Sequence, residues 1–109
     1  MSLGAAEITF ATDLFSDLPN LTTRRMFGGL ALYSDGTIFA LLRSDGALLI
    51  KAAEGPLAAQ LAEAGATRWT YARKDGHAAA MPYWTLPDTA LDDPAEAVAW
   101  ARRALAALG

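Results

Sequence analysis

The strongest constraint on the fold of this chain is the dipeptide Asp-Gly, which occurs three times, at 35–36, 45–46 and 75–76. Asp-Gly favours the tight type I′ turn of a β-hairpin, because both central residues of that turn need a positive φ. Segments of strand length flank each dipeptide, so each is expected to connect two antiparallel strands. The repeated turns therefore predict a sheet built from hairpins.

Five strands are predicted around these turns. The first two turns connect segments 26–33, 37–43 and 47–51, which predicts a three-stranded antiparallel meander. The third turn connects 68–74, in which Trp69 and Tyr71 share one face, to 77–86. Pro82 predicts that the last strand lies at an edge or contains a bulge, because proline donates no ladder hydrogen bond.

Three helices are predicted from apolar residues spaced three to four apart. The first begins near residue 5 and ends at Pro19, and the second begins at Gly55–Pro56 and ends near Gly65. The third has Asp93 as its N-cap, and Glu96 can close a capping box there. The predicted fold class is α+β, a two-layer sandwich with helices on one face of a five-stranded antiparallel sheet, in the order helix–βββ–helix–ββ–helix.

The composition is that of one folded domain. A chain of 109 residues, 53% hydrophobic and 19% charged, is expected to form a single domain over residues 1–109. Residues 1–4 are expected to be a flexible end or a remnant of cloning. No apolar run approaches the roughly 20 residues of a membrane span, so we expect a cytoplasmic protein without membrane contact.

Little in the sequence points to catalysis, a cofactor or a metal. The absence of cysteine excludes disulfides and thiolate sites, and His77, the one histidine, follows the third turn, where an exposed position is expected. The acidic residues are explained by turns and by helix capping, as at Asp35 and Asp93. We therefore expect a protein that is not an enzyme, with no cofactor and no metal ion.

Two groups of residues are candidates for a binding surface. Arg24 and Arg25 precede Gly28 and Gly29, which suggests either a bulge or close backbone approach at the glycines or an anion site. Four aromatic residues lie on two strands that are expected to pair: Trp69, Tyr71, Tyr83 and Trp84. One interpretation is that they pack across the strands and form a partly exposed patch for self-association, and the other is that they stack on nucleic-acid bases. The formal net charge of −3 disfavours the nucleic acid.

Several of these segments together resemble a known family. They are Arg25-Met-Phe-Gly-Gly29 with Tyr33-Ser-Asp-Gly36 downstream, Leu48-Leu-Ile-Lys-Ala52, Trp69-Thr-Tyr71 and Met81-Pro-Tyr-Trp-Thr-Leu-Pro87. The pattern, over about residues 10–108, resembles the N-terminal domain of the TfoX/Sxy family, although Pro82 stands where a small polar residue is usual. The resemblance implies a small α+β domain, often dimeric, from bacterial regulators of DNA-uptake competence that act on transcription. It brings no established catalytic residues.

The leading hypothesis is therefore a regulatory domain, present without the second domain of the namesake proteins, that acts through protein contacts as a homodimer. One alternative is direct nucleic-acid binding by a local basic patch, and another is an enzyme or small-ligand binder with a pocket between sheet and helices. The basic patch would comprise Arg24, Arg25, Arg43, Arg68, Arg73 and Lys74. The predicted interaction patch comprises Arg24, Arg25, Met26, Phe27, Gly28, Gly29, Trp69, Tyr71, Tyr83 and Trp84.

Overall fold

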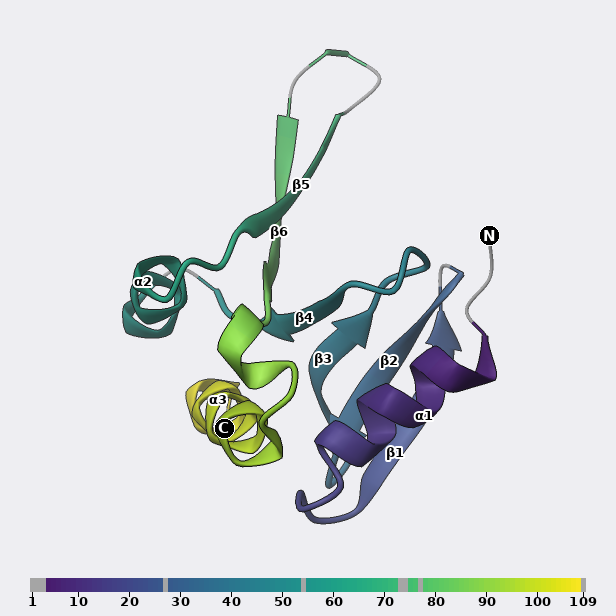
Figure 1. Cartoon of the computed structure of the whole chain (residues 1–109). Coiled ribbons are helices and arrows are strands. Elements are labelled where there is room, and N and C mark those ends of the chain that lie inside the picture. The colour runs from purple at the N-terminus through teal and green to yellow at the C-terminus, as the bar shows by residue number, and fades with distance from the viewer. Residues whose placement is uncertain (1–3, 27, 54, 73–74, 77, 109) are drawn as a thin grey trace.

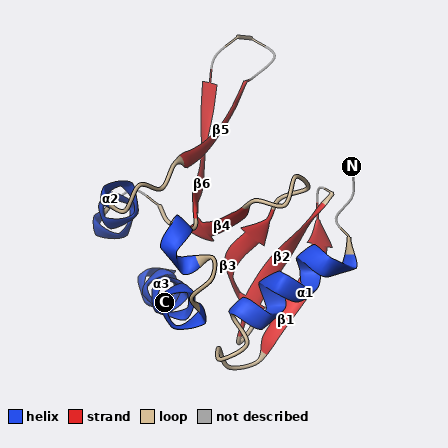
Figure 2. Ribbon diagram, in the orientation of Figure 1, coloured by secondary structure: helices blue, strands red, loops and turns tan. Residues whose placement is uncertain are grey.

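The computed structural model describes residues 4–26, 28–53, 55–72, 75–76 and 78–108. One antiparallel sheet carries three α-helices and a short 3₁₀ helix (Figure 1, Figure 2). The elements are α1 (Ala5–Leu14), β1 (Leu21–Met26), β2 (Gly29–Ser34), β3 (Thr37–Leu42), β4 (Leu48–Lys51), α2 (Pro56–Glu63), β5 (Arg68–Ala72), β6 (Ala78–Thr85), η1 (Asp88–Ala90) and α3 (Pro94–Leu108). No helix in these ranges is both long enough and apolar enough to cross a membrane.

The sheet has six strands in the order β1-β2-β3-β4-β6-β5, so the prediction of five strands is wrong. The missed strand is β1, which pairs with β2 from Leu21 opposite Ser34 to Met26 opposite Gly29. Its four central residues, from Thr22 to Arg25, are all polar and exposed. A strand that is polar on both faces has no hydrophobic alternation, and the sequence therefore shows it poorly. The observed order is helix–ββββ–helix–ββ–helix.

The predicted turn at Asp35–Gly36 is confirmed. Both residues have a positive φ, +50° and +79°, as a type I′ turn requires. The turn at Asp45–Gly46 is different, because only Gly46 has a positive φ there. It closes a longer hairpin, in which the backbone N–H of Gly46 donates to the Arg43 carbonyl and that of Arg43 donates to the Ala47 carbonyl.

The main core lies between the sheet and the three helices. The T-shaped ring pair of Phe15 and Phe39, with centroids 5.1 Å apart, connects the end of α1 to β3. Phe39 is an extra residue in its strand, because Leu32 lies opposite Ala40 while Tyr33 lies opposite Ile38. This bulge allows the consecutive residues Phe39 and Ala40 both to be fully buried in the same core.

The second face of the sheet is partly covered by the hairpin of β5 and β6. Ala31, Leu49 and Tyr83 are buried but do not belong to the core cluster beneath the helices. The registers place Leu49 opposite Leu41 and Thr85, on the other face from Ile50. Beyond this covered area the hairpin extends away from the rest of the sheet (Figure 1).

Pro82 lies in an interior strand, because β6 pairs with both β4 and β5. The predicted bulge is present: the register with β5 passes from Trp84 opposite Arg68 to Ala80 opposite Thr70. Within this gap the Arg68 side chain donates from Nε to the Met81 carbonyl at 3.0 Å. A side chain thus supplies a hydrogen bond to a carbonyl inside the bulge.

The N-cap of α3 forms as predicted, but the reciprocal half of the capping box does not. The Asp93 carboxylate accepts from the backbone N–H groups of Ala95 and Glu96 at 3.1 and 3.3 Å. The Glu96 carboxylate instead accepts from the hydroxyl of Thr89 and, at 3.4 Å, from the indole of Trp100. Glu96 therefore connects η1 to α3.

Candidate functional site

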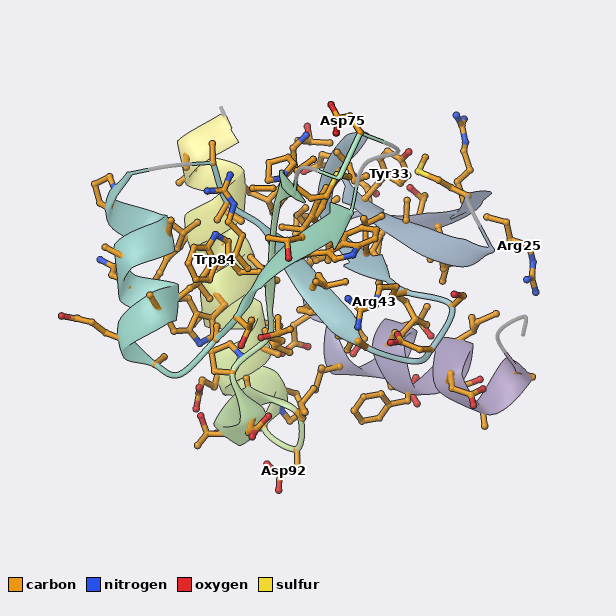
Figure 3. All side chains as sticks on the ribbon, turned by 90° about the horizontal axis from the view of Figure 1, so that it is seen from above. Arg25, Tyr33, Arg43, Asp75, Trp84 and Asp92 are labelled. Atoms are coloured by element: carbon orange, nitrogen blue, oxygen red, sulfur yellow. The ribbon has the colours of Figure 1, made fainter. Side chains whose placement is uncertain are left out.

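The two arginines of the predicted patch lie on the edge strand β1 and point in opposite directions. Arg24 lies opposite Ala31 and Arg25 lies opposite Leu30, and adjacent residues in a strand alternate between faces. Both side chains are exposed, and Arg25 points into solvent at the rim of the molecule (Figure 3). Because they diverge, these arginines do not form a clamp for one small anion.

The neighbouring glycines have a structural explanation. Gly28 adopts a φ of +76° between β1 and β2. A Cβ atom at Gly29 would overlap the backbone carbonyl oxygen of Leu42 in β3. The close backbone approach predicted for this pair is therefore present at Gly29. Phe27 of the predicted patch lies outside the described residues, as does His77.

The aromatic residues of the patch do not share one exposed surface. Trp84 lies opposite Ile50 and packs against the core on the side of α2 and α3 (Figure 3). Tyr83, on the opposite face, is 7% exposed. Trp69 is half-buried at the base of the hairpin. For Tyr71 the structure describes the backbone in β5 and not the side chain.

Arg43 anchors the base of this hairpin to the β3–β4 turn. Its guanidinium carbon lies 5.6 Å from the ring centroid of Trp69, within the range of a cation–π contact. The same guanidinium donates to Asp45 at 3.0 and 2.8 Å. These bonds, together with the Ala47 N–H, lower the pKa of Asp45 to about 2. Arg43 is thus engaged in structural contacts.

Tyr83 connects the hairpin to the second face of the sheet. Burial raises the pKa of Tyr83 above its ordinary value, and the electrostatic effect of Tyr33 on β2 adds to the shift. The neutral phenol of Tyr83 is the form that this packing favours.

The basic residues proposed as a nucleic-acid patch are dispersed. Arg24 and Arg25 diverge at one edge of the sheet, Arg43 is paired in a turn, and Arg68 bonds to the backbone of β6. Arg73 and Lys74 lie outside the described residues. The described part of this set therefore does not form one continuous basic surface.

A groove with a volume of about 520 Å³ lies between the β2–β3 turn, the segment after α1 and the C-terminal half of α3. Arg102 and Asp35 contribute opposite charges to its walls. The buried Ser34 hydroxyl already donates to the Pro19 carbonyl at 2.7 Å. Among the described residues, no three histidine or acidic side chains gather at a position where they could hold a metal ion.

A smaller cleft of about 180 Å³ lies where α1 meets the segment that leads into α3. Its apolar walls include Leu14, Leu91 and Phe10, and the side chain of Phe10 is 46% exposed. Asp13 and Asp92 stand at its rim, are exposed, and form no ion pair with the side chains that the structure describes. We call these residues, together with Pro94, the Phe10 cleft.

The charged side chains near the Phe10 cleft are all acidic. Its walls come from residues 10–14 and 91–94, which contain Asp13, Asp92 and Asp93 and no lysine or arginine. These carboxylates are visible in the sequence, where a cap explains Asp93. The sequence does not show that the two acidic segments meet around an exposed phenylalanine.

Comparison with known proteins identifies the family. The family model described as the TfoX N-terminal domain matches residues 13–108, which is nearly the whole chain. A search of curated proteins returned no match. The match spans all the strands of the sheet and all of α3, together with the segment whose glycines and Tyr-Ser-Asp-Gly turn suggested the resemblance. The chain therefore belongs to the TfoX N-terminal domain family, a family of regulatory domains.

Proposed function

We propose that this protein is a cytoplasmic regulatory module that acts through protein contacts, without catalysis, and that it forms a homodimer through the hairpin of β5 and β6. The process it regulates is gene expression, as the TfoX resemblance suggests. The family match supports the regulatory role. The observation that carries the proposal is the hairpin itself, which extends from the sheet and leaves the outer edge of β5 without a neighbouring strand among the described residues (Figure 1).

The physical argument concerns the outer half of the hairpin. There the two strands pair only with each other, Tyr71 opposite Ala79 and Ala72 opposite Ala78, while β4 pairs with β6 only from Tyr83 to Thr85. A two-stranded ladder without a packed face is marginally stable in water. An unpaired edge is also a template for another strand. Pairing with the same edge of a second copy would stabilise the two-stranded ladder and would give the unpaired edge of β5 a neighbouring strand.

Light scattering of purified variants tests the dimer. Thr70 on β5 and Ala80 on β6 lie opposite each other, and both are exposed. Thr70→Lys places a charge on the edge strand, where lysine opposes strand pairing, and should halve the mass. Ala80→Lys places the same charge on β6, which does not border the proposed contact at the outer edge of β5, and should leave the dimer intact. A wild-type protein that stays monomeric at high concentration would contradict the proposal.

If only Ala80→Lys dissociated the dimer, the dimer contact would lie on the face of the hairpin and not at the edge of β5. Circular dichroism of both variants checks that the fold is retained. The proposal assigns no role to nucleic acid, and a gel-shift titration at low salt examines that separately. Retarded DNA at micromolar protein would favour the nucleic-acid hypothesis, because non-specific affinities of about 10⁻⁴–10⁻⁶ M arise from charge alone.

A further inference from the structure

The Phe10 cleft combines an exposed apolar side chain with two exposed carboxylates, those of Asp13 and Asp92, that form no ion pair with the described side chains. Phe10 is the large hydrophobic residue that the structure leaves most exposed among those it describes. It lies four residues before Leu14 on α1, so both contribute to the same wall of the cleft. A volume of about 180 Å³ is below the range of about 300–1,000 Å³ typical of small-molecule sites. The cleft therefore fits one large apolar side chain better than a metabolite.

Local stability does not explain the charge at Asp13. This residue lies in the last turn of α1, where the helix dipole disfavours a negative charge, and that turn contains no basic residue. Asp92 lies on the opposite side of the cleft and carries the same charge. Two carboxylates facing one apolar cleft repel each other, and a cationic group between them would relieve that repulsion.

From this arrangement we propose that the Phe10 cleft is a docking site for a basic, apolar segment of a partner protein, with one large apolar side chain in the cleft and flanking lysine or arginine residues beside Asp13 and Asp92. The choice of occupant follows from charge complementarity: the charged side chains that line the cleft, those of Asp13 and Asp92, are both carboxylates. A phosphate backbone or an anionic membrane would be repelled by the same surface. This inference rests on the proposed function, because it identifies the kind of partner for a protein that acts through protein contacts.

Fluorescence polarisation with three labelled synthetic peptides of twelve residues tests the site. The first peptide alternates leucine pairs with lysine pairs, the second replaces each lysine by glutamate, and the third replaces each leucine by serine. We expect the wild-type protein to bind the first peptide and neither of the others. Binding of the lysine–serine peptide as strongly as the lysine–leucine peptide would overturn the proposal, because it would show attraction by charge alone.

Variants of the protein then locate the binding surface. Phe10→Ala should weaken binding about tenfold or more, as expected for truncation of a central apolar anchor. Asp13→Lys should weaken it similarly. Glu63→Lys is the matched control, because Glu63 is an exposed acid in the last turn of α2 and the substitution changes the net charge by the same amount. It should leave the affinity within about twofold.

Equal effects of Asp13→Lys and Glu63→Lys, or no effect of Phe10→Ala, would overturn the proposal. Light scattering of Phe10→Ala tests whether a second copy of this chain occupies the cleft. A loss of dimer mass would show that it does, and would also overturn the proposal of a basic partner segment. The two proposals fail separately, because Thr70→Lys should abolish the dimer and leave peptide binding intact. Thermal unfolding of each variant confirms that loss of binding is not loss of fold.

Discussion

At the scale of single residues, the two glycines where β1 leads into β2 show that one sequence pattern can meet two backbone requirements. Gly28 and Gly29 are neighbours, but they are needed for different reasons. The first adopts a left-handed conformation, and the second lies directly against the backbone of β3. Only the requirement at Gly29 depends on a distant part of the chain, because the backbone it contacts is that of Leu42, thirteen residues further along.

The two glycines should therefore respond differently to alanine. Gly28→Ala should cost about 1 kcal/mol, since alanine pays roughly 1–2 kcal/mol in the left-handed region and the nearest atom, the Ser44 Cβ, lies 3.7 Å from the added methyl. Gly29→Ala should cost more, about 3 kcal/mol, because the methyl would displace the Leu42 carbonyl. Urea unfolding of both variants measures the difference. A larger loss for Gly28→Ala would contradict this account of the turn.

At the scale of elements, the start of α3 distinguishes a capping hydrogen bond from a favourable charge. Asp92 and Asp93 both place a negative charge near the positive end of the helix dipole. Only Asp93 accepts backbone hydrogen bonds there among the described contacts. The pair therefore offers an internal comparison within one helix terminus.

Asp93→Ala should lower the free energy of unfolding by about 1 kcal/mol more than Asp92→Ala. Both variants lose one negative charge at the same helix end, so the difference between them isolates the two capping hydrogen bonds. Chemical denaturation followed by circular dichroism measures both values. Equal losses would mean that charge, and not the cap, stabilises this terminus.

At the scale of the whole molecule, the second face of the sheet depends on the hairpin that leaves it. Tyr83 is buried where this hairpin crosses the face, and burial raises its pKa. The raised pKa has a definite consequence for stability. The contribution of the neutral phenol is fully present below the unfolded pKa near 10, and it is lost as the pH rises toward the folded value.

Wild-type protein should therefore lose stability more steeply above pH 10 than the variant Tyr83→Phe, which has no phenol to ionise. The free energy of unfolding of both proteins is measured between pH 8 and about 11. Subtracting one pH profile from the other removes the contribution of lysine and arginine, which both proteins share. Parallel pH profiles would show that Tyr83 is accessible to solvent and that the hairpin does not cover this face.

The sequence by itself determined the turn at Asp35–Gly36 and the cap at Asp93, because each depends on residues close together in the chain. The antiparallel α+β class follows from such local turns and helix patterns, and the family follows from motifs distributed over residues 13–108. Tertiary structure alone decided the features that join distant segments. Strand β1 is visible only through its pairing with β2, since its central residues carry no apolar pattern. Strand alternation places the neighbours Tyr83 and Trp84 on opposite faces, and only the tertiary structure shows that each is covered there, so the predicted aromatic patch does not form one surface. The Phe10 cleft likewise required α1 to pack beside the start of α3, because charge patterning along a chain does not specify which segments meet.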